Sequence, residues 1–212
     1  MPTPRTTQIY QFGELDEKGK ERAREWFRSC RDSDDFEYVI EDAVRMGEIL
    51  GFEMHTHPVK LMNGNTRHAP SVWWQVAYCQ SDGAWIEASY RYAKGSTRII
   101  RKEAPQDATL HDLADRLLEL QKGYRYQLTA TVRDSDRGPM DLELDYPESR
   151  VPPAGASAVP STYDVLREII RDFEHWIYTQ LRTEDEYQRS DAVVDENIRA
   201  TEYEFLENGK RV

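Results

Sequence analysis

Cysteine is scarce in this sequence: Cys30 and Cys79 are the two among 212 residues, and each stands in an apolar pattern. Two cysteines exclude the dense disulfide framework that holds small secreted domains together. A chain of this length buries roughly 70% of its unfolded surface, so it needs no disulfide or metal for stability. We therefore expect both cysteines to be reduced core thiols of a cytosolic protein. A structural disulfide between them is the alternative.

Long hydrophobic runs are also absent. No apolar run comes near the 18 residues that suggest a membrane span, and the mean hydropathy is −0.80. The first ten residues, MPTPRTTQIY, contain no apolar h-region, so we expect no secretory signal. These absences predict a cytoplasmic protein without a membrane partner.

Recognisable catalytic and cofactor motifs are missing as well. The sequence has no Gly-rich phosphate-binding loop, no Gly-x-Ser-x-Gly and no Cys-x-x-Cys. The triplet Ser81-Asp82-Gly83 is better explained by a turn than by a serine nucleophile, and the spacing of the acids singles out no pair for acid–base catalysis. We predict a protein that is not an enzyme and binds no cofactor. An enzyme with an unrecognised site is kept as an alternative.

Three of the five histidines, His55, His57 and His68, fall close together in the sequence. A His-x-His on a strand places both rings on one face, as a metal site requires. No further ligand follows at a recognised spacing, so we predict no metal site here.

Acidic charge is abundant and unevenly spread. Residues 1–133 hold 20 acids and 19 Lys or Arg, a net charge of −1, whereas residues 134–207 hold 19 acids and 7 Arg, a net charge of −12. An acidic half disfavours nucleic acid as its direct ligand. It fits a basic protein partner or simple solubility.

Apolar periodicity predicts a chain that mixes helices and hairpins. We interpret the Pro/Ala/Gly-rich segment 150–161 as a surface linker, 62–70 as a polar loop and 94–102 as a basic loop and strand. The pattern favours a single α+β domain over 1–212, with an antiparallel or mixed sheet and helices packed mainly on one face. Helices are predicted over 16–30, 36–50, 104–123, 162–188 and 190–200, and strands over 6–12, 52–61, 124–134, 139–147 and 201–212.

The stretch WWQVAYCQSDGAWIEASYRY, residues 73–92, predicts a β-hairpin. Asp82-Gly83 between alternating runs is typical of a two-residue type I′ turn, which pairs Ser81 with Ala84. This register places Trp74, Tyr78 and Trp85 on one amphipathic face. The aromatic side chains are then either structural or an aromatic recognition face.

The acidic residues form two groups. Asp141, Glu143 and Asp145 alternate along a predicted strand, so their carboxylates project from one face about 6.6 Å apart. That spacing is close to the phosphate repeat of a nucleic-acid strand, so the row could mimic a backbone; a solvated strand is the alternative. The second group lies near predicted helix ends and contains Glu184, Asp185, Glu186, Asp191, Asp195 and Glu196.

Three segments carry a resemblance to a known family: YQFGELDEKGKERAREWF, WWQVAYCQSDGAWIEASYRY and AVVDENIRATEYEFLENGKRV. They resemble a largely uncharacterised family of small phage- and plasmid-borne proteins, some of them labelled antitoxin-like. Its members typically carry an aromatic segment leading into Gln-Ser/Gly-Asp-Gly-Ala and a C-terminal Asn/Thr-Glu-Tyr-Glu-Phe element. The resemblance implies a mobile-element context in the cytoplasm of a bacterial host cell, in which antitoxins and anti-defence proteins are common. It assigns no binding residue.

Together these observations predict an acidic protein-binding factor, antitoxin-like or anti-defence, that inhibits a host or mobile-element protein with a basic surface. One alternative is a nucleic-acid-associated protein that uses the basic segment 91–102 and the hairpin aromatics for stacking. The predicted partner-binding residues are Asp141, Glu143, Asp145, Glu184, Asp185, Glu186, Trp74, Tyr78 and Trp85.

Overall fold

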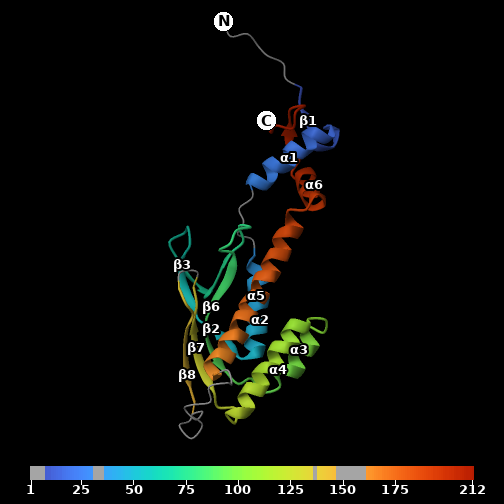
Figure 1. Cartoon of the computed structure of the whole chain (residues 1–212). Coiled ribbons are helices and arrows are strands. Elements are labelled where there is room, and N and C mark those ends of the chain that lie inside the picture. Colours follow the sequence, from blue (N-terminus) through green and yellow to red (C-terminus); the bar gives the residue numbers. More distant parts are fainter. Residues whose placement is uncertain (1–7, 31–35, 136–137, 147–160) are drawn as a thin grey trace. The chain divides into compact units, whose positions relative to one another are not determined.

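The computed structural model describes residues 8–30, 36–135, 138–146 and 161–212 (Figure 1). The chain forms two compact units. Residues 37–181 make the sheet unit, and residues 1–36 with 182–212 make the terminal unit. The predicted linker 150–161 falls outside the described residues except for Ser161, so its interpretation stays a prediction.

The sheet unit is built around one long strand, β6 (Gly83–Arg91). One edge of β6 pairs with β7 (Thr129–Arg133), which pairs with β8 (Asp141–Asp145). The other edge pairs with β5 (Val72–Gln75) through the first half of β6 and with β2 (Phe52–Met54) through the second half. All these pairings are antiparallel. Because β6 has partner strands along both edges, it is hydrogen-bonded on both sides.

Helices lie on one side of this sheet (Figure 1). They are α2 (Glu37–Leu50), α3 (Ser96–Glu103), α4 (Ala108–Gly123) and the greater part of α5 (Thr162–Gln188). The layers meet where Phe52 of β2 stacks on Phe173 of α5, with ring centroids 5.5 Å apart and both residues fully buried. This arrangement confirms the predicted α+β class with helices on one face of an antiparallel sheet. Among the described residues, no helix is long and apolar enough to cross a membrane.

The terminal unit joins the two ends of the described chain. Strand β1 (Tyr10–Gln11) pairs with β9 (Glu204–Phe205), and the short 3-10 helix η1 (Phe12–Glu14) leads into α1 (Glu17–Cys30). Helix α6 (Asp191–Ala200) contacts α1. The small core of the terminal unit consists of Phe12, Leu15, Ala23, Val194, Ile198 and Phe205.

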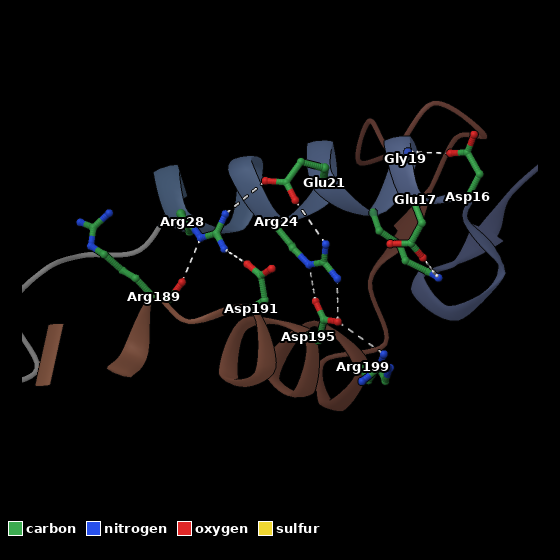
Figure 2. A network of polar contacts seen from close by, with 11 residues as sticks. Asp16, Glu17, Gly19, Glu21, Arg24, Arg28, Arg189, Asp191, Asp195 and Arg199 are labelled. Carbon is green, nitrogen blue, oxygen red and sulfur yellow. Dashed lines mark hydrogen bonds and ion pairs between the residues drawn. The ribbon is translucent and has the colours of Figure 1, made fainter. Parts of the chain in front are cut away.

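Ion pairs join α1 to α6 (Figure 2). Arg24 donates from Nε to Asp195 Oδ1 at 2.7 Å and from Nη2 to Oδ2 at 3.0 Å. Arg28 pairs with Asp191 and also donates to the carbonyl of Arg189. The hydrogen bonds from Arg24 lower the pKa of Asp195. These polar contacts add to the apolar packing of the small core between the two helices.

Several predicted segments differ from the structure. Residues 62–65 form the predicted loop, but 66–70 form β4 (Thr66–Pro70), which pairs with β3 (Thr56–Lys60), so that part of the prediction is wrong. Segment 94–102 lies mostly in α3, so the predicted basic loop and strand is also wrong. Both errors have one cause: an exposed two-stranded ladder and a short surface helix are held by backbone hydrogen bonds and need little apolar periodicity.

Two smaller predictions are corrected as well. Helix α4 begins at Ala108 rather than at residue 104, and it is capped by Asp107, whose Oδ1 accepts from Leu110 N at 3.0 Å. Cys30 and Cys79 are free, but both are exposed and are therefore not core thiols. Each ends an apolar pattern at a helix end or in a loop, where the pattern no longer reports burial.

Candidate functional site

Strand β6 shows which face of the sheet is covered. Its residues alternate between buried and accessible: Ala84, Ile86, Ala88 and Tyr90 are buried under the helices, whereas the residues between them are half-buried or, at Arg91, exposed. Neighbouring strands continue the alternation, because paired residues point the same way. In the part of the chain that the structure describes, no helix lies over the second face (Figure 1). We name it the open face; it carries Glu53, Trp73, Trp85, Glu87, Ser89, Arg91, Thr129, Thr131, Arg133, Asp141, Glu143 and Asp145.

Polar side chains run across the open face in rows that the strand register sets. One row crosses four strands: Glu53 lies opposite Ser89, Ser89 opposite Thr131, and Thr131 opposite Glu143. A shallow groove of about 460 Å³ follows this part of the sheet. Its walls include Glu53, Ser89, Arg91, Thr131, Glu143 and Asp145. A groove lined by carboxylates and hydroxyls accepts hydrogen-bond donors and positive charge.

The open face is negatively charged. It holds five acids, Glu53, Glu87, Asp141, Glu143 and Asp145, against two arginines, Arg91 and Arg133. Arg91 lies 3.6 Å from Glu53, and Arg133 lies 3.5 Å from Asp141 and 3.9 Å from Glu143. These side chains are half or more exposed, so the ion pairs are weak and screened by salt. The acids therefore keep much of their ability to attract an external cation.

Aromatic side chains close one end of the open face. Trp73 of β5 lies opposite Trp85 of β6, and His57 stacks on Trp73 with ring centroids 5.5 Å apart. All three side chains are only half-buried. Hydrophobic and aromatic surface beside charged groups is typical of the centre of a protein interface.

The β5–β6 connection differs from the predicted turn. Strand β5 ends at Gln75, which pairs with Gly83, so residues 76–82 form a seven-residue loop. Gly83 does not take the positive φ that a type I′ turn requires; in this loop Tyr78 does, at 57°. Asp82 instead holds the loop closed: its Oδ1 accepts hydrogen bonds from Ala77 N at 3.0 Å and Cys79 Sγ at 3.3 Å. The predicted register is wrong because Asp82 and Gly83 lie at the end of a seven-residue loop and not at the centre of a two-residue turn.

The new register separates the three aromatics that were predicted to share a face. Trp85 lies on the open face, whereas Trp74 pairs with Ala84, which is buried under the helices. Tyr78 projects from the loop and is 55% exposed. Trp73 instead takes the place beside Trp85 on the open face. A seven-residue loop assumed between the two strands would have predicted the pairing of Trp73 with Trp85 from the sequence.

The predicted acidic residues divide between the two units. Asp141, Glu143 and Asp145 are all exposed along β8, and the predicted alternation is confirmed. Glu184, Asp185 and Glu186 lie within α5 in the terminal unit, where Gln188 donates to Glu184, Arg189 to Asp185 and Arg182 to Glu186. Asp185 is 7% exposed. Their contacts within the helix make them structural partners, and their role in binding stays a prediction.

The histidines have local partners on the sheet. His55 Nε2 lies 2.9 Å from Ser89 Oγ, and His57 Nδ1 lies 3.5 Å from Ser71 Oγ. His68 pairs with Pro58 in the β3–β4 ladder. Over the described residues, no group of three or more potential metal-ligating side chains is brought together. The contact between His55 and Ser89 beside the groove was not predicted from the sequence, because the two residues lie 34 positions apart in the chain.

The basic segment lies in the other layer. Helix α3, which carries Arg98, Arg101 and Lys102, packs against α4 and α2. Arg101 forms an ion pair with Asp115 at 2.6 Å. Trp85 faces away from this layer, so the basic residues of α3 and the exposed tryptophans do not form one continuous stacking surface. Nucleic-acid binding by the two together stays a prediction that this geometry does not favour.

A pair of acids is buried under the covered face. Glu174 of α5 is 3% exposed and Asp134, just after β7, is also 3% exposed. Glu174 Oε1 accepts from Ile86 N at 3.2 Å, and Arg171 reaches Asp134 at 2.9 Å. Burial, together with the charge of Asp134, raises the pKa of Glu174 to about 9. The pair fastens α5 to the sheet and is closed to solvent, so we assign it to folding rather than binding.

Residues 36–191 match the family model described as "Domain of unknown function (DUF8835)". This range includes the whole sheet unit and leaves out α1 and most of α6. No curated protein and no solved structure matches the chain.

Proposed function

The chain belongs to the DUF8835 family of domains of unknown function, and we propose that its sheet unit is a protein-binding module that docks a positively charged partner on the open face. The observation that carries this proposal is the uncovered, organised sheet face with five acids against two arginines. An antitoxin-like or anti-defence inhibitor of a basic host protein is one form of such a module.

Electrostatics and shape support the same surface. The acids of β8 lie on a rigid strand, so their spacing is fixed before binding and little conformational entropy is lost. Trp73 and Trp85 add apolar area at the end of the groove. Long-range attraction by the acids speeds association, and burial of the tryptophans slows dissociation.

The experiment starts from the partner recovered with the full chain from its host. The binding constant of the purified pair is measured for wild type and for Asp141→Asn/Glu143→Gln/Asp145→Asn. We expect the triple variant to bind at least tenfold more weakly and to show a flatter dependence on salt, because screening acts on the charges that were removed. Its melting curve should stay close to that of wild type, since exposed carboxylates contribute little to stability.

A matched control removes three exposed acids from the helical layer: Glu41→Gln/Asp42→Asn/Glu48→Gln on α2. It changes the net charge by the same amount but leaves the open face intact. Equal losses in both variants would reduce the effect to total charge. Unchanged affinity of the β8 variant at low and at physiological salt would refute docking on this face. If the partner also binds DNA, competition between DNA and the chain tests the mimicry form of the proposal.

A further inference from the structure

Two aromatic side chains of the terminal unit hold a cation between them, and a third ring lies beside them. Trp26 and Tyr203 stand perpendicular, with ring centroids 5.2 Å apart and an interplanar angle of 89°. Phe27 lies beside both rings, 6.3 Å from Trp26 and 6.5 Å from Tyr203. The guanidinium carbon of Arg211 sits 4.9 Å from the Trp26 centroid and 4.5 Å from the Tyr203 centroid. We call Trp26, Phe27 and Tyr203 the aromatic cage.

Arg211 differs from the other arginines over aromatic rings in this unit. Arg24 and Arg199 lie over Phe12, but both also pair with the carboxylate of Asp195. For Arg211, no ion pair with an acid is present in the described part of the chain, and its side chain is exposed. The rings alone therefore hold this guanidinium in place, as aromatic cages hold organic cations.

The backbone on both sides of Arg211 is fixed by local contacts, whereas the Arg211 side chain itself is exposed. Gly209, at φ 76°, packs so tightly on the backbone of Gly19 that a Cβ would lie 2.0 Å from Gly19 O. Leu206 N donates to Lys210 O and Val212 N to Glu204 O, which fixes the last turn. Rotation of the Arg211 side chain would thus empty the cage without moving the backbone. The cage rings stay only half-buried in the core cluster they flank.

We propose that the aromatic cage is a recognition site for an arginine side chain of a partner protein, and that Arg211 occupies it as a built-in competitor. The guanidinium already present defines the ligand chemistry: a planar cation that offers its face to the rings. The site lies in the terminal unit and does not depend on the open face. A partner's arginine binds when it displaces Arg211, so the resident side chain weakens the apparent affinity and rejects poor ligands.

The test uses the full chain and N-acetylarginine amide as the probe, with N-acetylcitrulline amide as its uncharged counterpart. Binding is followed by NMR at the indole N–H of Trp26. We expect Arg211→Ala to bind the arginine probe at least fivefold more tightly than wild type. Arg211→Lys, which restores a cation, should bind it nearly as weakly as wild type. The citrulline probe should give no saturable shift with either protein.

A second variant ties the effect to the rings. Adding Tyr203→Leu to Arg211→Ala should abolish the gain, because one wall of the cage is lost. The proposal fails if Arg211→Ala binds the probe no better than wild type, or if the double variant binds it equally well. It also fails if Arg211→Ala loses the dispersed Trp26 signal, since Arg211 would then be a structural clasp of the terminal unit.

Discussion

Glu174 and Asp134 form a pair of buried carboxyl groups between α5 and the sheet, with Arg171 2.9 Å from Asp134 and 3.9 Å from Glu174. Each acid has one buried oxygen without a well-aligned hydrogen bond, Glu174 Oε2 and Asp134 Oδ2. A proton on Glu174 relieves the repulsion between the two groups, in keeping with its pKa of about 9. Helix α5 is thus attached to the sheet through a protonated acid at neutral pH.

This pair predicts a pH-dependent stability. The pKa of Glu174 is higher in the folded chain than its ordinary value of 4.5, so the native state binds a proton that the unfolded state releases. Stability contributed by this group is full below pH 4.5 and falls as the pH rises towards about 9. Glu174→Gln removes the dependence and should stabilise the protein at pH 8 by several kcal/mol, on the order of 5, since each pH unit between 4.5 and 8 is worth about 1.4 kcal/mol.

Denaturant melts at pH 5 and pH 8 measure this effect. The stability gap between Glu174→Gln and wild type should be wider at pH 8. Glu168→Gln, at an exposed position on the same helix, is the control. A gap that is equal at the two pH values would show that Glu174 keeps an ordinary pKa in the folded protein.

Gly83 tests the observed β5–β6 connection, and Gly51, between α2 and β2, is the reference position. Gly51 has φ 104°, and a Cβ there would lie 2.1 Å from Arg91 O, so Gly51→Ala should cost several kcal/mol, on the order of 3. Gly83 lacks a positive φ, and its Cβ would meet the Trp85 ring at 3.2 Å, so Gly83→Ala should cost about 1 kcal/mol or less. Thermal melts of both variants give the comparison. A large loss at Gly83 would favour the two-residue turn instead.

The ion pair of Arg24 and Asp195 predicts the acid sensitivity of the terminal unit. Its two hydrogen bonds lower the pKa of Asp195, so their stabilisation is present above the ordinary value of 3.8 and is lost as the pH falls through the folded value. Asp195→Asn should cost about 1–3 kcal/mol at pH 7 and progressively less below pH 4. Asp191→Asn, at a more exposed pair, should cost less.

Hydrogen exchange of the α6 amides, followed at several pH values, reads out this local effect. If Asp195→Asn and Asp191→Asn destabilise α6 equally at pH 7, the bidentate pair has no special weight in the terminal unit.

The two neighbouring tryptophans of β5 should behave differently. Trp73 lies on the open face and Trp74 on the covered side. We expect Trp73→Ala to weaken partner binding by at least tenfold with a modest loss of stability, because its ring is available to an interface. Trp74→Ala should mainly lower the melting temperature, because its side chain points to the covered side of the sheet and its packing there is lost. If Trp74→Ala weakened partner binding and Trp73→Ala mainly lowered the melting temperature, the register of a two-residue turn would be favoured instead.

Local patterns in the sequence determined much of the fold. Helix α5 runs from Thr162 to Gln188, as its continuous apolar stripe predicts, and Ser161 bonds with Asp164 at its start. Helices α1, α2 and α6 also fall where the 3.6-residue period places them. The acids of β8 alternate with buried Leu142, because side chains of one strand point to opposite faces whatever surrounds them.

Tertiary structure decided the rest. Which tryptophan meets Trp85 depends on the loop length between β5 and β6, and a shift by one residue moves every side chain to the other face. The open face exists because the helices that the structure describes in the sheet unit pack on one side, and no single strand determines that side. Glu174 meets Asp134, and Arg211 meets Trp26, across 40 and 185 residues of chain. Such contacts arise from the packing of distant segments, which periodicity within one segment does not report.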